Sequence, residues 1–324
     1  MGAKSLSFYL LRALYKGGAW LFDRSGPLAP ALAQASDVAH SRLFPRSFVM
    51  KVPNPVELGG LRVYHDGRPS YHLQMLAMGT HDRDVVSLLE AFVKPGMTVL
   101  DVGAHFGYFS LLSARLVGPR GSVWAFEPVP HAIQLLVRNI EVNNFAGRIH
   151  VVPQAVSDAP GTATIHSNPA ESMTSTLYPG TVALSTAANR PGKAASNSPR
   201  FRPIEVACTS LDDWSARQNW PPVDMVKMDI EGAETAALRG MVQTSRRNPR
   251  LKLIVEFNPK TLSAAGVSIG EFWGALEACG FGRISMAGPP LRLVDFPADL
   301  PLIMQEIRRL GNDRVNLLCE KGAA

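Results

Sequence analysis

Short apolar runs alternate with amphipathic stretches from Met97 to the end of the chain. Runs of mostly apolar residues bounded by Gly, Pro or charged residues are typical of buried strands. Stretches with an apolar residue every three or four positions separate these runs, and that spacing predicts helices. We expect strands at 98–102, 122–127, 148–153, 224–229, 251–257, 281–286 and 314–320. We expect helices at 108–117, 130–143, 233–242, 268–279 and 300–310.

This order of elements predicts the class of fold. Strands that are linked by helices form a mostly parallel sheet with helices on both faces. A long segment with one helix separates the last two strands, so we expect the last strand to be antiparallel. The pattern therefore predicts an α/β domain over residues 73–324 with a seven-stranded, mostly parallel sheet.

The first 72 residues have a different pattern. Leu6, Leu10 and Leu14 recur at helical spacing while Arg12 and Lys16 lie on another face. Such a basic amphipathic helix packs on its own protein or a twin subunit, or it lies on an anionic membrane surface. We favour packing for this leader (residues 1–72), and peripheral membrane contact through the N-terminal helix stays open.

A second unusual segment lies between the expected third and fourth strands. No acidic residue occurs between Glu171 and Glu205, a segment rich in Ser, Thr, Ala, Asn, Pro and Gly, and residues 185–200 (STAANRPGKAASNSPR) have few apolar side chains. A segment with so few apolar side chains gains little by ordering, so we expect a flexible loop. It is either a substrate lid or a solvated insertion.

Composition and charge exclude several classes of protein. The formal net charge is +6, from 33 basic and 27 acidic residues. The leader holds nine basic and four acidic residues, so most of the excess lies outside the α/β domain. That domain lacks the basic stripe of a nucleic-acid binder, and we expect no nucleic-acid partner.

We also expect no transmembrane helix, because no run of 18 apolar residues occurs.

The three cysteines are widely spaced, which argues against a disulfide framework and against a metal knuckle. Each lies among apolar residues, so we interpret all three as buried, unreactive thiols. With no signal peptide recognised and no paired cysteines, a cytoplasmic location is expected.

The run DVGAHFG (101–107) follows the first expected strand and leads into a helix. Gly103 permits a sharp turn, and Gly107 lets the helix pack closely. We expect backbone N–H groups at this helix start to face a ligand. Glu127 ends the second strand, where a carboxylate can accept both hydroxyls of a ribose. Together these features predict a site for a nucleoside-containing cofactor.

Two kinds of cofactor compete for this site. A nicotinamide dinucleotide usually requires Gly-x-Gly-x-x-Gly, whereas this turn has two glycines and a histidine. Asp101, directly before the turn, would repel a pyrophosphate and attract the ammonium and sulfonium of S-adenosylmethionine. The sign of the charge favours S-adenosylmethionine. The alternative is a nicotinamide-dependent Rossmann oxidoreductase.

A second cluster of charges, KMDIEGAE (227–234), follows the fourth expected strand. If the backbone stays extended, Lys227, Asp229 and Glu231 point to one side. Glu234 begins the next helix, where a carboxylate complements the helix dipole. Three carboxylates at one strand end are unfavourable unless paired, hydrated or bound to a cation. This end lies at the same sheet edge as the glycine turn, which predicts a substrate site there.

The motifs together resemble FkbM-type methyltransferases. The likeness covers about residues 75–260 and is weaker at VNLLCEK (315–321). It rests on GTHDRD, KPGMTVLDVGAHFGYFS, GSVWAFEPVP, RNIEVNN and QAVSD within 79–158, on TSLDDW (209–214), on VDMVKMDIEGAETAALRGM (223–241) and on LIVEFNP (253–259). The resemblance implies a class I, Rossmann-like, S-adenosylmethionine-dependent methyltransferase. It also implies O-methylation of a sugar, a glycan or a secondary metabolite.

The resemblance implies roles for single residues as well. Asp82 stands where the family commonly has a glutamate that closes over the donor, and His105 replaces a more usual asparagine. Ala155 would border adenine, and Glu127 would hold the ribose. The full set of residues implied to bind the cofactor is Asp82, Asp101, Gly103, Ala104, His105, Gly107, Glu127 and Ala155.

Methyl transfer to a hydroxyl needs a group that removes the proton. Asp229 and Glu231 are our candidate bases, with Lys227 as pairing cation or substrate anchor. A divalent metal on the acidic cluster would serve as well, since Mg²⁺ prefers oxygen ligands. A non-catalytic interaction protein on a methyltransferase scaffold is a further alternative. Metal dependence and oligomeric state stay open.

Overall fold

The computed structural model describes residues 52–67, 71–78, 82–167, 175–176, 202–288, 290–310 and 313–322. The expected leader helix and the expected loop at 185–200 lie outside the described residues, so both stay predictions. None of the described helices is long and apolar enough to cross a membrane.

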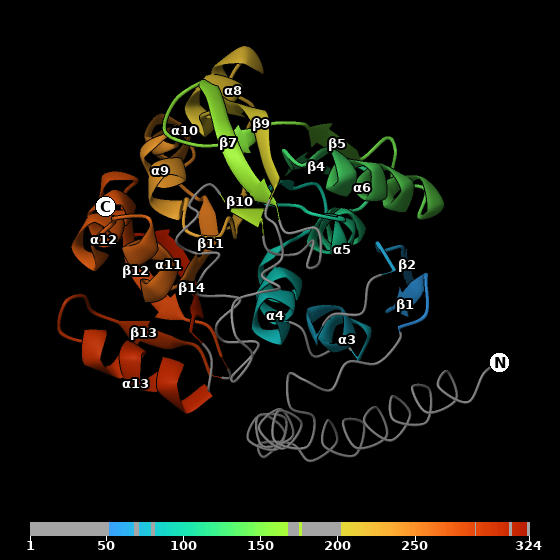
Figure 1. Ribbon diagram of the computed structural model, residues 1–324. Coiled ribbons are helices and arrows are strands. Elements are labelled where there is room, and N and C mark those ends of the chain that lie inside the picture. Colours follow the sequence, from blue (N-terminus) through green and yellow to red (C-terminus); the bar gives the residue numbers. More distant parts are fainter. Residues whose placement is uncertain are drawn as a thin grey trace.

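A central sheet organises the described part of the chain, with eight strands in the order β13-β12-β14-β11-β10-β3-β4-β5 (Figure 1). The strands are β3 (Thr98–Val102), β4 (Ser122–Phe126), β5 (Ile149–Val152), β10 (Met225–Met228), β11 (Lys252–Phe257), β12 (Phe281–Met286), β13 (Arg292–Val294) and β14 (Val315–Lys321). The run β11-β10-β3-β4-β5 is parallel, while β14 is antiparallel to both of its neighbours. The predicted class I sheet with an antiparallel last strand is therefore confirmed, and β13 is an additional edge strand.

Helices cover both faces of this sheet (Figure 1). One face packs against α4 (Arg83–Phe92), α5 (Tyr108–Val117) and α6 (Pro130–Val142). The other face packs against α8 (Leu211–Arg217), α9 (Glu234–Arg239), α11 (Pro259–Ala264), α12 (Ile269–Ala278) and α13 (Leu300–Leu310). Successive strand residues point to opposite faces, so Val99 belongs to the first core and Leu100 to the second.

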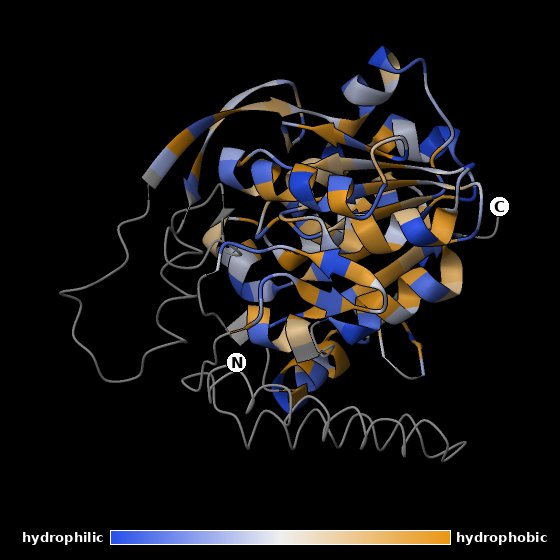
Figure 2. Cartoon of the chain, turned by 90° about the vertical axis from the view of Figure 1, so that its right-hand side faces the viewer, coloured by the Kyte–Doolittle hydropathy of each residue, from blue (hydrophilic) through white to orange (hydrophobic). Residues whose placement is uncertain are grey.

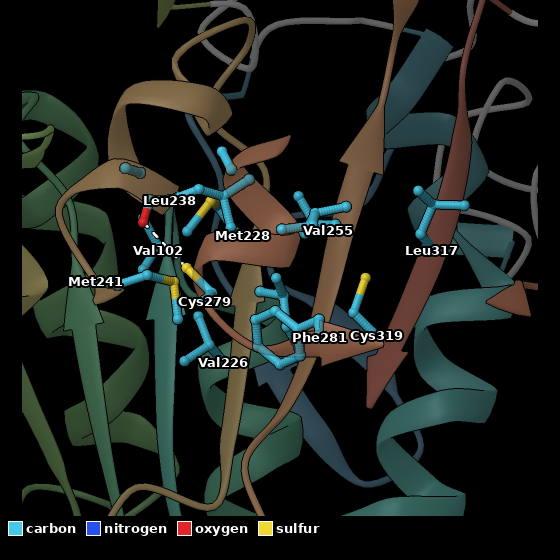
Figure 3. Close-up of a cluster of buried hydrophobic side chains, with 14 of the residues drawn as sticks. Val102, Val226, Met228, Leu238, Met241, Val255, Cys279, Phe281, Leu317 and Cys319 are labelled. Carbon is cyan, nitrogen blue, oxygen red and sulfur yellow. Dashed lines mark hydrogen bonds between the residues drawn. The ribbon is translucent and has the colours of Figure 1, made fainter. Parts of the chain in front are cut away.

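The interior is mostly apolar, and Figure 2 shows hydrophobic residues concentrated on the strands and on the helix faces turned toward them. Figure 3 shows part of the second core, with Cys279 and Cys319 among aliphatic side chains. All three cysteines are buried, as the sequence predicts. The Cys279 thiol donates to the carbonyl oxygen of Leu238 at 3.2 Å, and burial raises its pKa to about 12.

The predicted helix over 233–242 is divided in two, so that prediction is wrong at its C-terminal end. α9 ends at Arg239, and α10 (Val242–Arg247) begins three residues later. The Asp212 carboxylate accepts the N–H groups of Gln243 and Thr244, which caps the start of α10. A cap supplied by a distant residue is not visible in a helical pattern.

A second, smaller sheet was not predicted. Its described strands run β6-β9-β7-β8, comprising β6 (Ala155–Val156), β7 (Gly161–Ser167), β8 (Ser175–Thr176) and β9 (Arg202–Thr209). Its small core includes Ala155, Ile165 and Val206. Because these strands contain many small and polar residues, they lack the apolar runs that indicate the main strands.

The described end of the leader packs on the α/β domain. β1 (Val56–Leu58) and β2 (Leu61–Val63) form a hairpin, followed by α3 (Tyr71–Met78), and their buried side chains join the core around α5. Asn139 of α6 exchanges two hydrogen bonds with the backbone of Tyr64, next to β2. Asn143, the C-cap of α6, exchanges two with the backbone of Arg62 in β2. The expected division between residues 72 and 73 stays a prediction.

Candidate functional site

Polar side chains gather at the edge of the sheet where the parallel strands end and β14 begins. Asp101 of β3, Lys227 of β10, Glu256 of β11 and Asn316 of β14 stand at positions that point toward α4 and α5. The strand register pairs Lys227 with Asp101 and Glu256 with Asn316. All four side chains belong to buried residues, with exposed fractions between 1% and 9%. A buried row of charges and amides therefore runs across four adjacent strands.

Asp101 and Lys227 form the first pair in this row. The Lys227 ammonium lies 3.5 Å from Asp101 Oδ1, and the Ser110 hydroxyl donates to Asp101 Oδ2 at 2.5 Å. Burial alone would lower the pKa of Lys227, but the charges of Asp101 and Asp229 outweigh it and raise that pKa. Lys227 is therefore charged and balances Asp101. Asp101 is 1% exposed, so its expected direct contact with a cationic ligand stays a prediction.

The glycine turn after β3 is built from backbone hydrogen bonds. Gly103 has a φ of 83°, and its N–H and that of Ala104 both donate to the Phe126 carbonyl oxygen at 3.0 Å. The N–H of His105, which has a φ of 51°, donates to Glu127 Oε2 at 2.8 Å. The N–H groups of these three turn residues are therefore used within the chain. The expectation that N–H groups at the start of α5, which begins at Tyr108, face a ligand stays a prediction.

Glu127 joins two loops at this edge. Besides His105, it accepts the N–H of Val129 at 2.9 Å through Oε1. Burial raises the pKa of Glu127 to about 7, although both backbone hydrogen bonds oppose that rise. An ionised carboxylate has about four acceptor positions, so two further hydrogen bonds can be accepted.

The segment after β10 forms a turn. β10 ends at Met228, and Glu231 has a φ of 53°, so the expected extended run from Lys227 through Asp229 to Glu231 is wrong. The Asp229 side chain is 25% exposed and lies 4.0 Å from the Lys227 ammonium. Glu234 accepts the N–H groups of Ile230 and Gly232, both at 2.9 Å. The turn is thus held by a carboxylate of the following helix.

Glu231 of this turn and Glu234 of the following helix have raised pKa values. Burial, together with the negative charge of Asp229, raises the pKa of Glu231 to about 8, while Arg314 opposes the rise. Burial raises the pKa of Glu234 to about 7, and its backbone hydrogen bonds oppose it. The half-buried Glu231 is therefore mostly protonated at neutral pH.

Arg314 is a site residue that the sequence analysis missed. One guanidinium nitrogen lies 2.8 Å from Glu256 Oε2 and another 3.3 Å from Asp82 Oδ1. Arg314 also interacts electrostatically with Asp229 and Glu231. The signal that could have found it is the direction of the last strand. An antiparallel strand begins at the edge where the parallel strands end, and Arg314 immediately precedes β14.

The remaining predicted cofactor residues surround the same edge. Asp82 is the N-cap of α4, and Gly107 is the N-cap of α5. A Cβ at Gly107 would lie 2.4 Å from the Leu136 side chain, so the close packing it permits is against α6. Ala155 is buried in β6 and shares a small core with Val129, two residues beyond Glu127.

Two acidic side chains at this edge are engaged in other contacts. Glu234 accepts backbone N–H groups, and Glu256 pairs with Arg314. Among the residues that the structure describes, no group of three or more His, Cys, Asp or Glu side chains is arranged to hold a metal ion.

Known proteins resemble this chain in sequence. The 31-O-demethyl-FK506 methyltransferase FkbM of Streptomyces tacrolimicus is 27% identical over 209 residues, which cover 61% of this chain and 77% of that protein. The 2-O-methyltransferase NoeI of Sinorhizobium fredii (strain NBRC 101917 / NGR234) is 28% identical over 165 residues, covering 50% and 63%. The methyltransferase sdnD of Sordaria araneosa is 29% identical over 157 residues, covering 44% and 60%. The chain thus spans about three fifths of the length of the latter two relatives.

A solved structure of the methyltransferase FkbM from Methylobacillus flagellatus KT aligns with 79% of this chain and 56% of its own, at 16% identity and a TM-score of 0.40. The family model described as "Methyltransferase FkbM domain" matches residues 101–282. That range begins at Asp101, includes the glycine turn, Glu127 and the 227–234 cluster, and covers more than half of the 324 residues. With the class I sheet and these motifs in one continuous match, the chain belongs to the FkbM methyltransferase domain family.

Proposed function

We propose that this protein is an S-adenosylmethionine-dependent O-methyltransferase that acts on a hydroxyl of a sugar, a glycan or a secondary metabolite. The observation that carries the proposal is the convergence of the Gly103 turn, Glu127 and the Asp229–Glu231 turn at one sheet edge. The printed names of two relatives, a 31-O-demethyl-FK506 methyltransferase and a 2-O-methyltransferase, support oxygen as the acceptor atom.

The residues at this edge fit the methyl donor. Glu127 keeps acceptor capacity for the two ribose hydroxyls beyond its two backbone hydrogen bonds. Ala155 would border the adenine, and Asp82 would close over the donor. Asp101, Gly103, Ala104, His105 and Gly107 would form the wall on the methionine side. Asp101 would act there through its pair with Lys227, because its own side chain is enclosed.

When bound, S-adenosylmethionine supplies a methyl group on a positively charged sulfur. Asp229 takes the proton of the acceptor hydroxyl, since its carboxylate is part-exposed at this edge and can be reached by an acceptor. Glu231, protonated at neutral pH, donates a hydrogen bond that orients the acceptor. Lys227 pairs with Asp101 and Asp229 and so helps to fix their positions. Most of the rate enhancement comes from orienting the acceptor oxygen toward the methyl group.

Titration calorimetry with S-adenosylhomocysteine tests the donor half of the proposal. Saturable binding supports it, and the absence of binding would overturn it. Mass spectrometry of glycans and small metabolites, from cells with and without the protein, tests the acceptor half. A product heavier by one methylene unit supports methyl transfer. Binding without any methylated product would favour the non-catalytic scaffold.

Donor binding should depend on pH through Glu127. The ribose hydroxyls donate to the ionised carboxylate, and the pKa of Glu127 is about 7. Affinity for S-adenosylhomocysteine should therefore rise about tenfold between pH 6 and pH 8, as the ionised fraction rises from about one tenth to about nine tenths. Calorimetry over this pH range checks the prediction.

The matched control is Glu127→Gln, which keeps the shape but cannot ionise. Its affinity should be lower than that of the wild type at pH 8 and should change little with pH. A pH dependence that persists in Glu127→Gln would assign the titration to another group.

A further inference from the structure

The N-terminus of α4 lies on the buried polar row of the sheet. Asp82 is the N-cap of this helix, a position where an aspartate usually accepts an N–H group of its own helix. Within the described residues, the Asp82 side chain makes no such cap and lies 3.3 Å from Arg314. Asp84 is the second residue of α4, and its Oδ2 accepts the side-chain N–H of Asn316 at 2.9 Å. Arg314 and Asn316, at the start of β14, therefore hold the N-terminus of α4.

Arg314 is fixed from its other side by the sheet. Its second nitrogen lies 2.8 Å from Glu256, whose carboxylate is 2% exposed and stands opposite Asn316 in the strand register. A guanidinium is planar and carries donors along two edges, so it can bind two carboxylates at a fixed angle. An ammonium on a flexible stem cannot fix that angle. Arg314 thus links the end of β11 to the start of α4.

The backbone conformation of Asp82 explains why the link to Arg314 matters. Asp82 has a φ of 43°, a left-handed conformation that an aspartate adopts more readily than most residues but that still requires support. The ion pair with Arg314 and the hydrogen bond between Asp84 and Asn316 supply that support from two neighbouring positions. The contact with Arg314 thereby ties the orientation of the Asp82 side chain to the start of β14.

We propose that Arg314 is a positioning residue for the methyl donor, which holds Asp82 over the carboxyl edge of the sheet. This inference rests on the proposed function, in which Asp82 closes over the donor. Arg314 acts through Asp82 and does not itself touch the donor. The direction of β14 is essential to this role, because a parallel last strand would place its first residue at the opposite edge.

A double-mutant cycle tests the proposal, with S-adenosylhomocysteine as the probe and calorimetry as the measurement. Arg314→Gln should raise the dissociation constant about tenfold, and Asp82→Asn should raise it by a similar factor. The Arg314→Gln/Asp82→Asn double variant should bind within about twofold of the weaker single variant, because the two residues act as one unit. In turnover, Arg314→Gln should raise the KM for the donor while kcat changes less than threefold.

The control is Asp313→Asn, which removes the exposed Lys260–Asp313 ion pair one residue away and should leave binding unchanged. If the factors of the two single variants multiply, Arg314 contacts the donor directly and the positioning role is overturned. A lowered melting temperature with unchanged affinity in Arg314→Gln also overturns it. If the wild-type protein does not bind S-adenosylhomocysteine, the proposed function itself is overturned, and this inference with it.

Arg314→Gln leaves the buried Glu256 carboxylate without its partner, which can prevent folding. The Arg314→Gln/Glu256→Gln variant removes both charges and then takes the place of Arg314→Gln in the cycle. The expected results are the same for that series: weaker binding, and no further loss when Asp82→Asn is added.

Discussion

Replacing Gly103 with alanine is expected to weaken donor binding and to lower methyl transfer strongly. A Cβ at this position would lie 2.1 Å from the carbonyl oxygen of Asp229 and 3.0 Å from the Ile230 side chain. The Gly103 turn follows β3, and Asp229 follows β10. Because these two strands are paired in the main sheet, neither segment can move without displacing the other. The displaced backbone carries Asp229, so a shift of about 1 Å should lower turnover about 10²-fold or more.

Gly96→Ala separates this contact from backbone strain. Gly96 has a φ of 88°, close to the 83° of Gly103, but a Cβ there would meet nothing within 4 Å. Left-handed backbone at a non-glycine residue should lower the free energy of unfolding by about 1–2 kcal/mol in both variants. Thermal unfolding and calorimetry with S-adenosylhomocysteine check the pair. A Gly103→Ala variant that binds as well as Gly96→Ala would contradict the prediction.

The main sheet could be predicted from the sequence because its strands are buried on both faces. β3 and β12 have the predicted bounds, and so do α5 and α13. In the sequence a glycine directly follows the last residue of β3, α5 and α13, and a glycine directly precedes β12. The small sheet could not be predicted in the same way. β7 and β9 cover only a small core, so few of their positions need a large apolar side chain.

Site residues could be predicted from the sequence where they lie at or directly after the end of a predicted strand. Asp101 and Lys227 are adjacent in the register, and their contact follows from the parallel pairing of two predicted strands. The roles of Glu231 and Arg314 depend on features that no local pattern contains. Glu231 lies in a left-handed turn held by Glu234, and Arg314 reaches the site because β14 runs antiparallel.

The second large effect is expected from Asp229→Asn, which should lower kcat about 10²- to 10⁴-fold while donor affinity stays nearly unchanged. An amide keeps the size of the side chain but cannot take the proton of the acceptor hydroxyl. Steady-state kinetics and calorimetry on the same preparation check both parts. Unchanged turnover would exclude Asp229 as the base.

Glu231→Gln distinguishes the two carboxylates of this turn. Because burial and the charge of Asp229 raise the pKa of Glu231 to about 8, the wild-type side chain is about nine tenths protonated at pH 7, and glutamine resembles that form. Glu231→Gln should therefore keep nearly full turnover at pH 7, in contrast to Asp229→Asn. Above pH 8 the wild type should lose turnover as Glu231 ionises, whereas Glu231→Gln should not.

The opposite assignment makes opposite predictions for the same variants. If Glu231 were the base, wild-type turnover would rise through pH 8 and Glu231→Gln would be inactive at every pH. Because the charge of Asp229 helps to raise the pKa of Glu231, Asp229→Asn also lets Glu231 ionise at lower pH and take over part of the proton transfer. The Asp229→Asn/Glu231→Gln double variant measures that contribution, since residual turnover that disappears in the double variant came from Glu231.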